Sequence, residues 1–183
     1  MPLSPASERK LIHTREIRCQ GFERADGLWD IEGRIVDTKS YTFANDERSV
    51  AAGEALHDMQ IRLTIDQDML VHAVETVTNS SPFTICGNIT PSFEKLVGLR
   101  VGLGWRKAVN ERVGGALGCT HIVDLLLGPL AVTAFQSMSA VRRRHQAENA
   151  DPARKPPLMN TCHAFASDGA IVKRRWPQHY TGK

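Results

Sequence analysis

Apolar and polar side chains alternate without a break between positions 57 and 66. The first series is His57, Met59, Ile61, Leu63 and Ile65, and the second is Asp58, Gln60, Arg62, Thr64 and Asp66. A period of two predicts a half-buried β-strand with the first series facing a core. The polar residues 66–68 predict a turn, and residues 69–77 a returning strand. We therefore expect a β-hairpin over 57–77.

A second alternation runs through residues 28–39. Trp29, Ile31, Gly33 and Ile35 alternate with Asp30, Glu32, Arg34 and Val36, so one face of this predicted strand is charged. Residues 15–22 are a plausible partner strand, joined to it by a turn at 25–27.

The hydrophobic period lengthens after residue 90. It predicts a short helical turn at 91–97, a helix over 105–113 that ends at Gly114, and a long helix over 120–146. Pro129 should kink the long helix, because proline lacks the donor N–H. Residues 161–166 and 170–176 flank Ser167-Asp168-Gly169 and predict a final hairpin.

The elements together predict an α+β fold with N-terminal, mainly antiparallel strands, central helices including one long kinked helix, and a C-terminal hairpin. The 183-residue length is typical of one domain. Residues 1–12 are expected to be a flexible terminus, and the proline-rich residues 150–157 an internal linker.

Composition narrows the class of protein. Hydrophobic residues make up 42% and charged residues 23%, as in ordinary soluble globular proteins. Asp124, Gly128 and Pro129 interrupt the longest apolar run, which falls short of the roughly 20 residues that span a membrane. The first residues lack an apolar signal, so we expect a cytoplasmic protein with reduced cysteines. A net charge of +3 and 6% aromatic residues argue against nucleic-acid binding.

The glycine-rich segment 114–121 leads directly into the predicted long helix. It places Cys119 and His121 beside Thr120, a suitable N-cap. The free N–H groups at a helix start stabilise anions, thiolates and developing oxyanions. This indicates a functional site, although a tight turn with a packed cysteine and histidine explains the same residues.

Two further groups of side chains are candidates for chemistry. Glu32 and Tyr41 stand out on and after the charged strand, whose simpler explanation is a solvated sheet face. His57 lies on the apolar side of its strand, where it is either a core histidine bonded to a carbonyl group or a residue facing a pocket.

Motifs for other chemistry are weak or missing. Cys119, His121, Cys162 and His163, with His57, offer metal ligands, but neither a Cys-x-x-Cys nor a His-x-x-x-His pair occurs. Residues 98–104 lack the Gly-x-Gly-x-x-Gly pattern of dinucleotide-binding folds. The sequence has no Gly-x-Ser-x-Gly elbow and no P-loop.

The chain resembles the bacterial family known as domain of unknown function 2889. The strings that carry the resemblance are GLWDIEGR at 27–34, DTK at 37–39, HDM at 57–59, RLT at 62–64, GCTH at 118–121, GPLA at 128–131 and AFQ at 134–136. The resemblance extends over nearly the whole chain, from about residue 15 to the region of residue 176.

The activity that we associate with this resemblance is that of cofactor-independent formaldehyde lyases acting on phenylcoumaran dimers from lignin. It implies a phenolic substrate with a hydroxymethyl group, and neither a metal nor another cofactor. His57 or His121 would remove the hydroxymethyl proton, while Tyr41, Lys39 or Arg34 would stabilise the phenolate.

The full candidate set contains catalytic and substrate-binding residues. The catalytic candidates are His57, His121, Tyr41, Glu32 and Lys39, and the substrate-binding candidates are Trp29, Arg34, Cys119 and Thr120. Two alternatives remain: a metal-binding or thiol-dependent accessory protein, and a hydrolase of aromatic acyl compounds with Cys119 as nucleophile. We also expect a homodimer through the apolar residues 122–135, because two-fold dimers are the commonest soluble oligomers.

Overall fold

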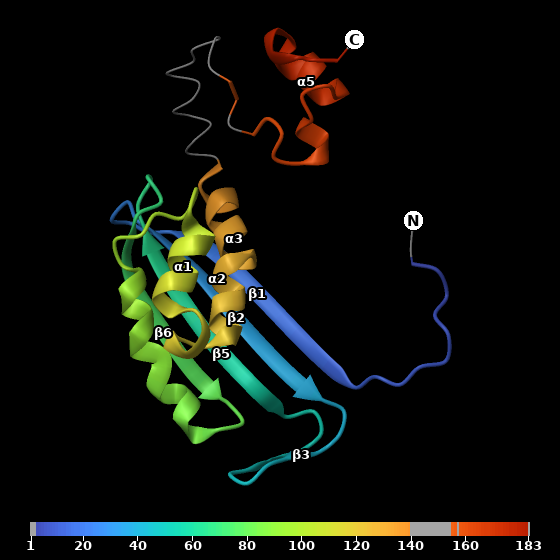
Figure 1. Ribbon diagram of the computed structural model, residues 1–183, viewed down its shortest axis with the longest axis vertical. Coiled ribbons are helices and arrows are strands. Elements are labelled where there is room, and N and C mark those ends of the chain that lie inside the picture. Colours follow the sequence, from blue (N-terminus) through green and yellow to red (C-terminus); the bar gives the residue numbers. More distant parts are fainter. Residues whose placement is uncertain (1–2, 140–154, 157, 183) are drawn as a thin grey trace. The chain divides into compact units, whose positions relative to one another are not determined.

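The computed structural model of the protein describes residues 3–139, 155–156 and 158–182 (Figure 1). Its contacts divide the chain into two units, Met1–Ala140 and Val141–Lys183. The length of the chain predicts one domain. Most of the linker expected at 150–157 lies outside the described residues. Residues 3–12, the expected flexible terminus, are exposed and carry no helix or strand.

Four antiparallel strands form the main sheet of the first unit. They are β1 (His13–Glu23), β2 (Trp29–Lys39), β5 (Ala55–Ile65) and β6 (Val71–Ser80), in the order β1-β2-β5-β6. A two-stranded ribbon of β3 (Phe43–Ala44) and β4 (Ser49–Val50) is inserted between β2 and β5. The predicted N-terminal strands and the hairpin over 57–77 are confirmed, because side-chain alternation correctly indicated which segments bury one face.

The two faces of the sheet differ as the alternation predicts. The inner face is apolar, with Ile31, Ile35, Met59, Ile61 and Leu63 all buried. The outer face carries ion pairs, in which Arg62 contacts both Glu32 and Glu75, and Arg34 contacts Asp58. Glu32, Arg34, Arg62 and Glu75 line a hollow of about 250 Å³. The pairs of Arg62 are exposed and contribute little stability, whereas the pair of Arg34 with Asp58 is half-buried. The charged strand face is therefore largely a solvated surface.

Helices cover the inner face (Figure 1). A 3₁₀ segment, η1 (Thr84–Leu96), packs along β6 and is followed by α1 (Trp105–Val113), the short turn η2 (Gly115–Leu117), α2 (Thr120–Leu127) and α3 (Pro129–Ser137). The predicted helix over 105–113 is confirmed, whereas the turn expected at 91–97 is the end of the longer η1. Cys119, rather than Thr120, is the N-cap of α2, and its side chain makes no capping hydrogen bond.

The long helix is kinked as expected. Helices α2 and α3 together bend by 37° at Gly128-Pro129, because Pro129 has no N–H to donate. The rest of the predicted helix, 140–146, lies outside the described residues. Ile122, Leu125, Leu126 and Leu130 are fully buried within this unit. The apolar side chains expected to form a dimer face thus belong largely to the core, and self-association stays a prediction.

The second unit corrects the expected C-terminal hairpin. Residues 161–176 contain η3 (His163–Phe165) and α5 (Ala170–Arg175), followed by η4 (Pro177–His179). Gly169 is the extended N-cap of α5, the basic residues Lys173 to Arg175 lie in its last turn, where they complement the helix dipole, and Val172 is buried. The turn signal at 167–169 therefore starts a helix.

Within the described residues, no helix is long and apolar enough to cross a membrane.

We predict that Gly118→Ala destabilises the protein by about 1–3 kcal/mol. A Cβ atom at Gly118 would lie 2.2 Å from the backbone oxygen of Val113, which a side-chain rotation cannot relieve. Gly102→Ala is the matched control, because no atom lies within 4 Å of its Cβ position. Urea unfolding measures both free energies, and equal values for the two variants would contradict this account of the turn.

Candidate functional site

A buried carboxylate lies at the end of the inner face of β2. Asp37 continues the series Ile31, Gly33 and Ile35, and only 1% of its surface is exposed. Arg15 stands opposite it on β1 and donates from Nε to Oδ1 and from a terminal nitrogen to Oδ2, both at 2.8 Å. The two parallel bonds form a bidentate ion pair, which compensates the cost of burying the carboxylate.

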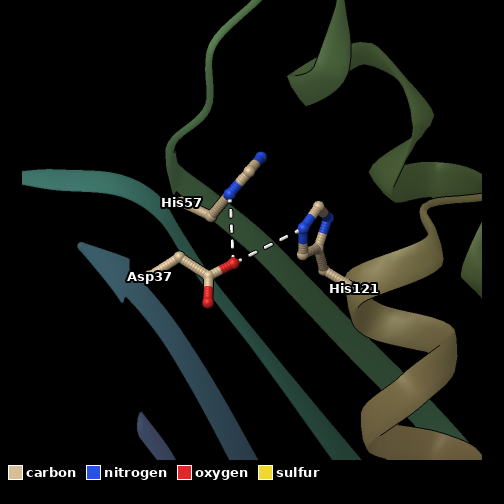
Figure 2. A group of neighbouring side chains, drawn as sticks. All are labelled: Asp37, His57 and His121. Carbon is tan, nitrogen blue, oxygen red and sulfur yellow. Dashed lines mark ion pairs between the residues drawn. The ribbon is translucent and has the colours of Figure 1, made fainter. Parts of the chain in front are cut away.

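Two histidines approach Asp37 from different elements (Figure 2). His57 is its partner in the register of β5, and its Nδ1 lies 3.1 Å from Oδ2. His121 lies in the first turn of α2, with Nε2 3.5 Å from the same oxygen. The centres of the two imidazole rings are 3.9 Å apart. We call Asp37, His57 and His121 the Asp-His-His cluster.

The contact between His57 and Asp37 is close but poorly directed for a hydrogen bond. Nδ1 of His57 is buried and, among the described residues, has no partner with hydrogen-bond geometry. Figure 2 shows the other ring nitrogen, Nε2, on the side of the ring away from Asp37. A fourth polar group, Nε2 of His13, lies 3.4 Å from Oδ1 of the carboxylate.

The surroundings shift the pKa values of all three groups. Burial lowers the pKa of His57 to about 4, and His121 acts in the same direction, against the opposite effect of Asp37. Burial and the charge of Arg15 lower the pKa of His121. Burial alone would raise the pKa of Asp37, but the hydrogen bonds and charge of Arg15 lower it overall. At neutral pH the cluster therefore contains a carboxylate and neutral imidazoles.

An apolar cleft of about 640 Å³ opens beside the two histidines. Its lining comes from β5, from η1 with the residues before it, and from the start of α2. These residues are His57, Met59, Pro82, Phe83, Ile85, Cys86, Asn88, Ile89, Gly118, Cys119, Thr120 and His121. Phe83 and Ile85 are 42% and 70% exposed. A cleft of this size with few polar groups is typical of small-molecule sites.

The structure brings four of the predicted site residues together. His57, His121, Cys119 and Thr120 all line the cleft. Sγ of Cys119 is 3.8 Å from Nδ1 of His121 and 3.4 Å from the sulfur of Met59. The glycine-rich segment thus leads into a helix whose first residues line the cleft.

The other five predicted residues lie elsewhere. Glu32 and Arg34 form ion pairs on the outer face of the sheet, and Trp29 is buried at the opposite end of β2 from Asp37. Lys39 ends β2, and Tyr41 follows it with 46% of its surface exposed. None of these five is among the residues that line the cleft in the described part of the chain.

Asp37 and Arg15 were not among the site residues predicted from the sequence. Asp37 had a signal, because alternation along 29–37 places a carboxylate on the apolar face, where it requires a partner. Arg15 had none, since its pairing depends on the register between β1 and β2. The proposed metal ligands Cys162 and His163 belong to the second unit. Among the described residues, the group whose donor atoms lie close enough to share an ion is the Asp-His-His cluster.

Comparison with known proteins gives one family. A family model described as "Protein of unknown function (DUF2889)" matches residues 13–136, well over half of the chain. The matched range runs from β1 into α3 and includes the Asp-His-His cluster and Arg15. No curated protein and no solved structure matched the chain.

We predict that the protein loses stability as the pH falls from 6.5 to 4, by at most about 3 kcal/mol through His57. The ordinary pKa of 6.5 applies to the unfolded chain and a pKa of about 4 to the folded one. The unfolded state therefore binds the extra proton across this interval. Asp37, whose pKa is lowered, adds a loss only as the pH falls below its unfolded value.

Urea unfolding between pH 7 and pH 4.5 measures this loss. The variant His57→Gln should flatten the dependence of the unfolding free energy on pH. His72→Gln should not, because His72 is an exposed residue of β6 that pairs with Asp66 outside the cluster. The same pH dependence in the wild type and in His57→Gln would show that His57 is not responsible.

Proposed function

The chain belongs to the DUF2889 family of proteins of unknown function, and we propose that it is a lyase that releases formaldehyde from a phenolic aromatic dimer of the phenylcoumaran type. One observation carries the proposal: the Asp-His-His cluster stands beside an apolar cleft with His57 and His121 in its lining. The resemblance described above supplies the substrate class, and the site supplies groups suited to proton transfer.

The cleft suits an aromatic substrate. Its volume falls within the roughly 300–1,000 Å³ of typical small-molecule sites. Phe83, Ile85 and Ile89 offer apolar surface to aromatic rings. Asn88 and Thr120 are polar lining residues that can orient a phenol or a hydroxymethyl group by hydrogen bonds.

We assign the role of general base to His57. Its Nδ1 lies 3.1 Å from Asp37, and its Nε2 lies on the other side of the ring. When Nε2 accepts a proton, the nearby carboxylate stabilises the imidazolium. Arg15 keeps the carboxylate ionised and fixes its orientation. His121 shares the carboxylate and is the second candidate for the proton transfers.

The proposed reaction is an overall cleavage without oxidation or reduction. The substrate phenol loses its proton, the carbon–oxygen bond of the five-membered ring breaks, and the released oxygen takes up a proton, which leaves a quinone methide. His57 then removes the hydroxymethyl proton, and the carbon–carbon bond to that group breaks. Formaldehyde leaves, the electron pair restores the aromatic ring, and the phenol regains a proton. The stilbene and formaldehyde together contain all the atoms of the substrate.

A further role in the proposed reaction is that of the group that stabilises the phenolate. Arg34 is occupied by Asp58 on the outer face of the sheet, which disfavours the role expected for it. Lys39 and Tyr41 do not line the cleft in the described part of the chain, but they follow Asp37 closely in the sequence, and we keep them as the candidate donors to the phenolate oxygen. The role needs a positive charge or an acidic hydrogen-bond donor close to where negative charge develops.

We predict that chelator-treated protein converts a racemic phenylcoumaran dimer with a free hydroxymethyl group to equal amounts of formaldehyde and stilbene. His57→Gln should lower the rate by about 10²–10⁴-fold, the usual contribution of a general base. His72→Gln is the matched control and should keep the wild-type rate. Formaldehyde trapping and stilbene absorbance measure the two products. If the folded wild-type protein forms neither, the lyase proposal is wrong.

A second candidate function has its own observation. Cys119, His121 and Asp37 follow one another with Sγ 3.8 Å from Nδ1 and Nε2 3.5 Å from Oδ2. This is the order of groups in a cysteine nucleophile, its base and the residue that orients the base. The arrangement supports a hydrolase of aromatic acyl compounds, with Cys119 attacking the acyl carbon at the N-terminus of α2.

For this hydrolase we predict that iodoacetamide labels Cys119 at neutral pH at least about tenfold faster than Cys86, because Nδ1 of His121 lies 3.8 Å from its Sγ and can accept the thiol proton as the sulfur reacts. Both cysteines line the cleft and both are half-buried, so Cys86 is an internal control. Peptide mass spectrometry follows the two sites separately. Equal labelling of the two cysteines would exclude an activated Cys119 and leave the lyase as the remaining proposal.

A further inference from the structure

The donor atoms of the Asp-His-His cluster converge as metal ligands do. One donor atom from each of Asp37, His57 and His121 lies within 4.8 Å of the other two. Oδ2 of Asp37 lies 3.1 Å from Nδ1 of His57 and 3.5 Å from Nε2 of His121. Ligands about 2.0–2.1 Å from a tetrahedral ion stand about 3.3 Å apart. The two distances lie on either side of that value, so the carboxylate oxygen already has the spacing of a shared ligand sphere with each histidine.

One nitrogen of the cluster has no hydrogen-bond partner among the described residues. Nδ1 of His57 is buried and, within the described ranges, has no aligned hydrogen-bond partner. An unsatisfied buried polar atom costs free energy. The separation of 3.5 Å between His121 and Asp37 is likewise at the upper limit for a hydrogen bond. A cation shared by the three donors would satisfy the lone pairs of both imidazoles and of the carboxylate.

The surroundings support the carboxylate as a ligand. Arg15 holds Asp37 in a fixed orientation by two hydrogen bonds, as outer-shell partners of metal ligands do. Its positive charge also weakens the attraction of any cation. The site should therefore prefer an ion that gains much of its affinity from imidazole nitrogen, as Zn²⁺ and its transition-metal neighbours do, over Mg²⁺ or Ca²⁺.

We propose that Asp37, His57 and His121 form a binding site for one divalent transition-metal ion, with its remaining coordination position directed to the cleft. Three protein ligands and an open position are typical of reactive rather than purely structural sites. The metal ligands that the sequence offered were Cys119, His121, Cys162 and His163, with His57. The geometry keeps His57 and His121 from that set and adds Asp37.

The inference goes beyond the proposed lyase and does not depend on it. An ion on Nδ1 of His57 leaves the proton on Nε2, and this ring can then no longer act as the general base. Metal binding and the proposed proton transfer therefore exclude each other. Binding is measured without substrate, so a failure to bind metal and a failure to release formaldehyde are separate results.

The test is a calorimetric titration of the chelator-treated 183-residue chain with Zn²⁺. Metal analysis of the loaded protein then gives the number of ions per chain. We expect one ion per chain. Asp37→Asn, His57→Gln and His121→Gln should each weaken binding by more than about 100-fold, beyond the effect of losing an outer-shell partner. Cys119→Ser and His72→Gln are controls and should change the affinity by less than about threefold. Circular dichroism checks that each variant is folded.

A spectroscopic measurement on the wild type keeps the test decisive if a variant fails to fold. Co²⁺ bound by the Asp-His-His cluster should show visible bands of a nitrogen and oxygen site and no thiolate-to-cobalt charge-transfer band. A charge-transfer band, together with loss of binding in Cys119→Ser, would overturn the assignment in favour of a cysteine-containing set. Absence of stoichiometric binding of both Zn²⁺ and Co²⁺ to the folded wild type would overturn the site itself.

Discussion

The ion pair between Arg15 and Asp37 is the interaction on which the site depends. Asp37 is 1% exposed, and without a partner its buried carboxylate would lower the free energy of unfolding by several kcal/mol. Arg15 satisfies both of its oxygens from the neighbouring strand, and the two histidines border one of them. Strands β1, β2 and β5 and helix α2 thus meet at one charged group, and any change in their packing alters its surroundings.

The fold explains why this charge lies at a cleft instead of deep in the core. Asp37 is near the end of β2, where the register shifts between it and the next residue, and it pairs with His57 on β5. Helix α2 begins beside this end of the sheet, so its first turn presents His121 to the carboxylate. The close approach of Gly118 to Val113 permits the turn that starts the helix there. The polar cluster therefore lies between the apolar core and the cleft.

The same three side chains suit both of the chemistries that we propose, because imidazole lone pairs bind either protons or metal ions. Burial favours neutral imidazoles, as the lowered pKa values of both histidines indicate. A neutral imidazole is the form that accepts a proton and also the form that binds a metal. Which of them occupies Nδ1 of His57 decides how the cluster can act on a molecule in the cleft.

The sequence by itself determined the local structure of this protein. Periods of two and of 3.6 residues depend on which face of an element is buried, so they identified the strands, helix α1 and the kinked helix. They also placed His57 on the inner face and the Asp30-Glu32-Arg34 series on the outer one. The failure at 167–169 has a local cause, because the same polar, glycine-containing turn can begin a helix or close a hairpin.

The tertiary structure alone decided which residues form the site. Arg15, Asp37, His57 and His121 are far apart in the sequence, and only strand register and helix packing bring them together. Periodicity gives the face of a residue but not its neighbour on the next strand. For this reason Asp37 was overlooked although its face was predictable, and Arg34 and Glu32 were proposed although they pair with other residues. A shift of the register by one residue would move Asp37 to the outer face of the sheet and Glu32 and Arg34 to the inner face.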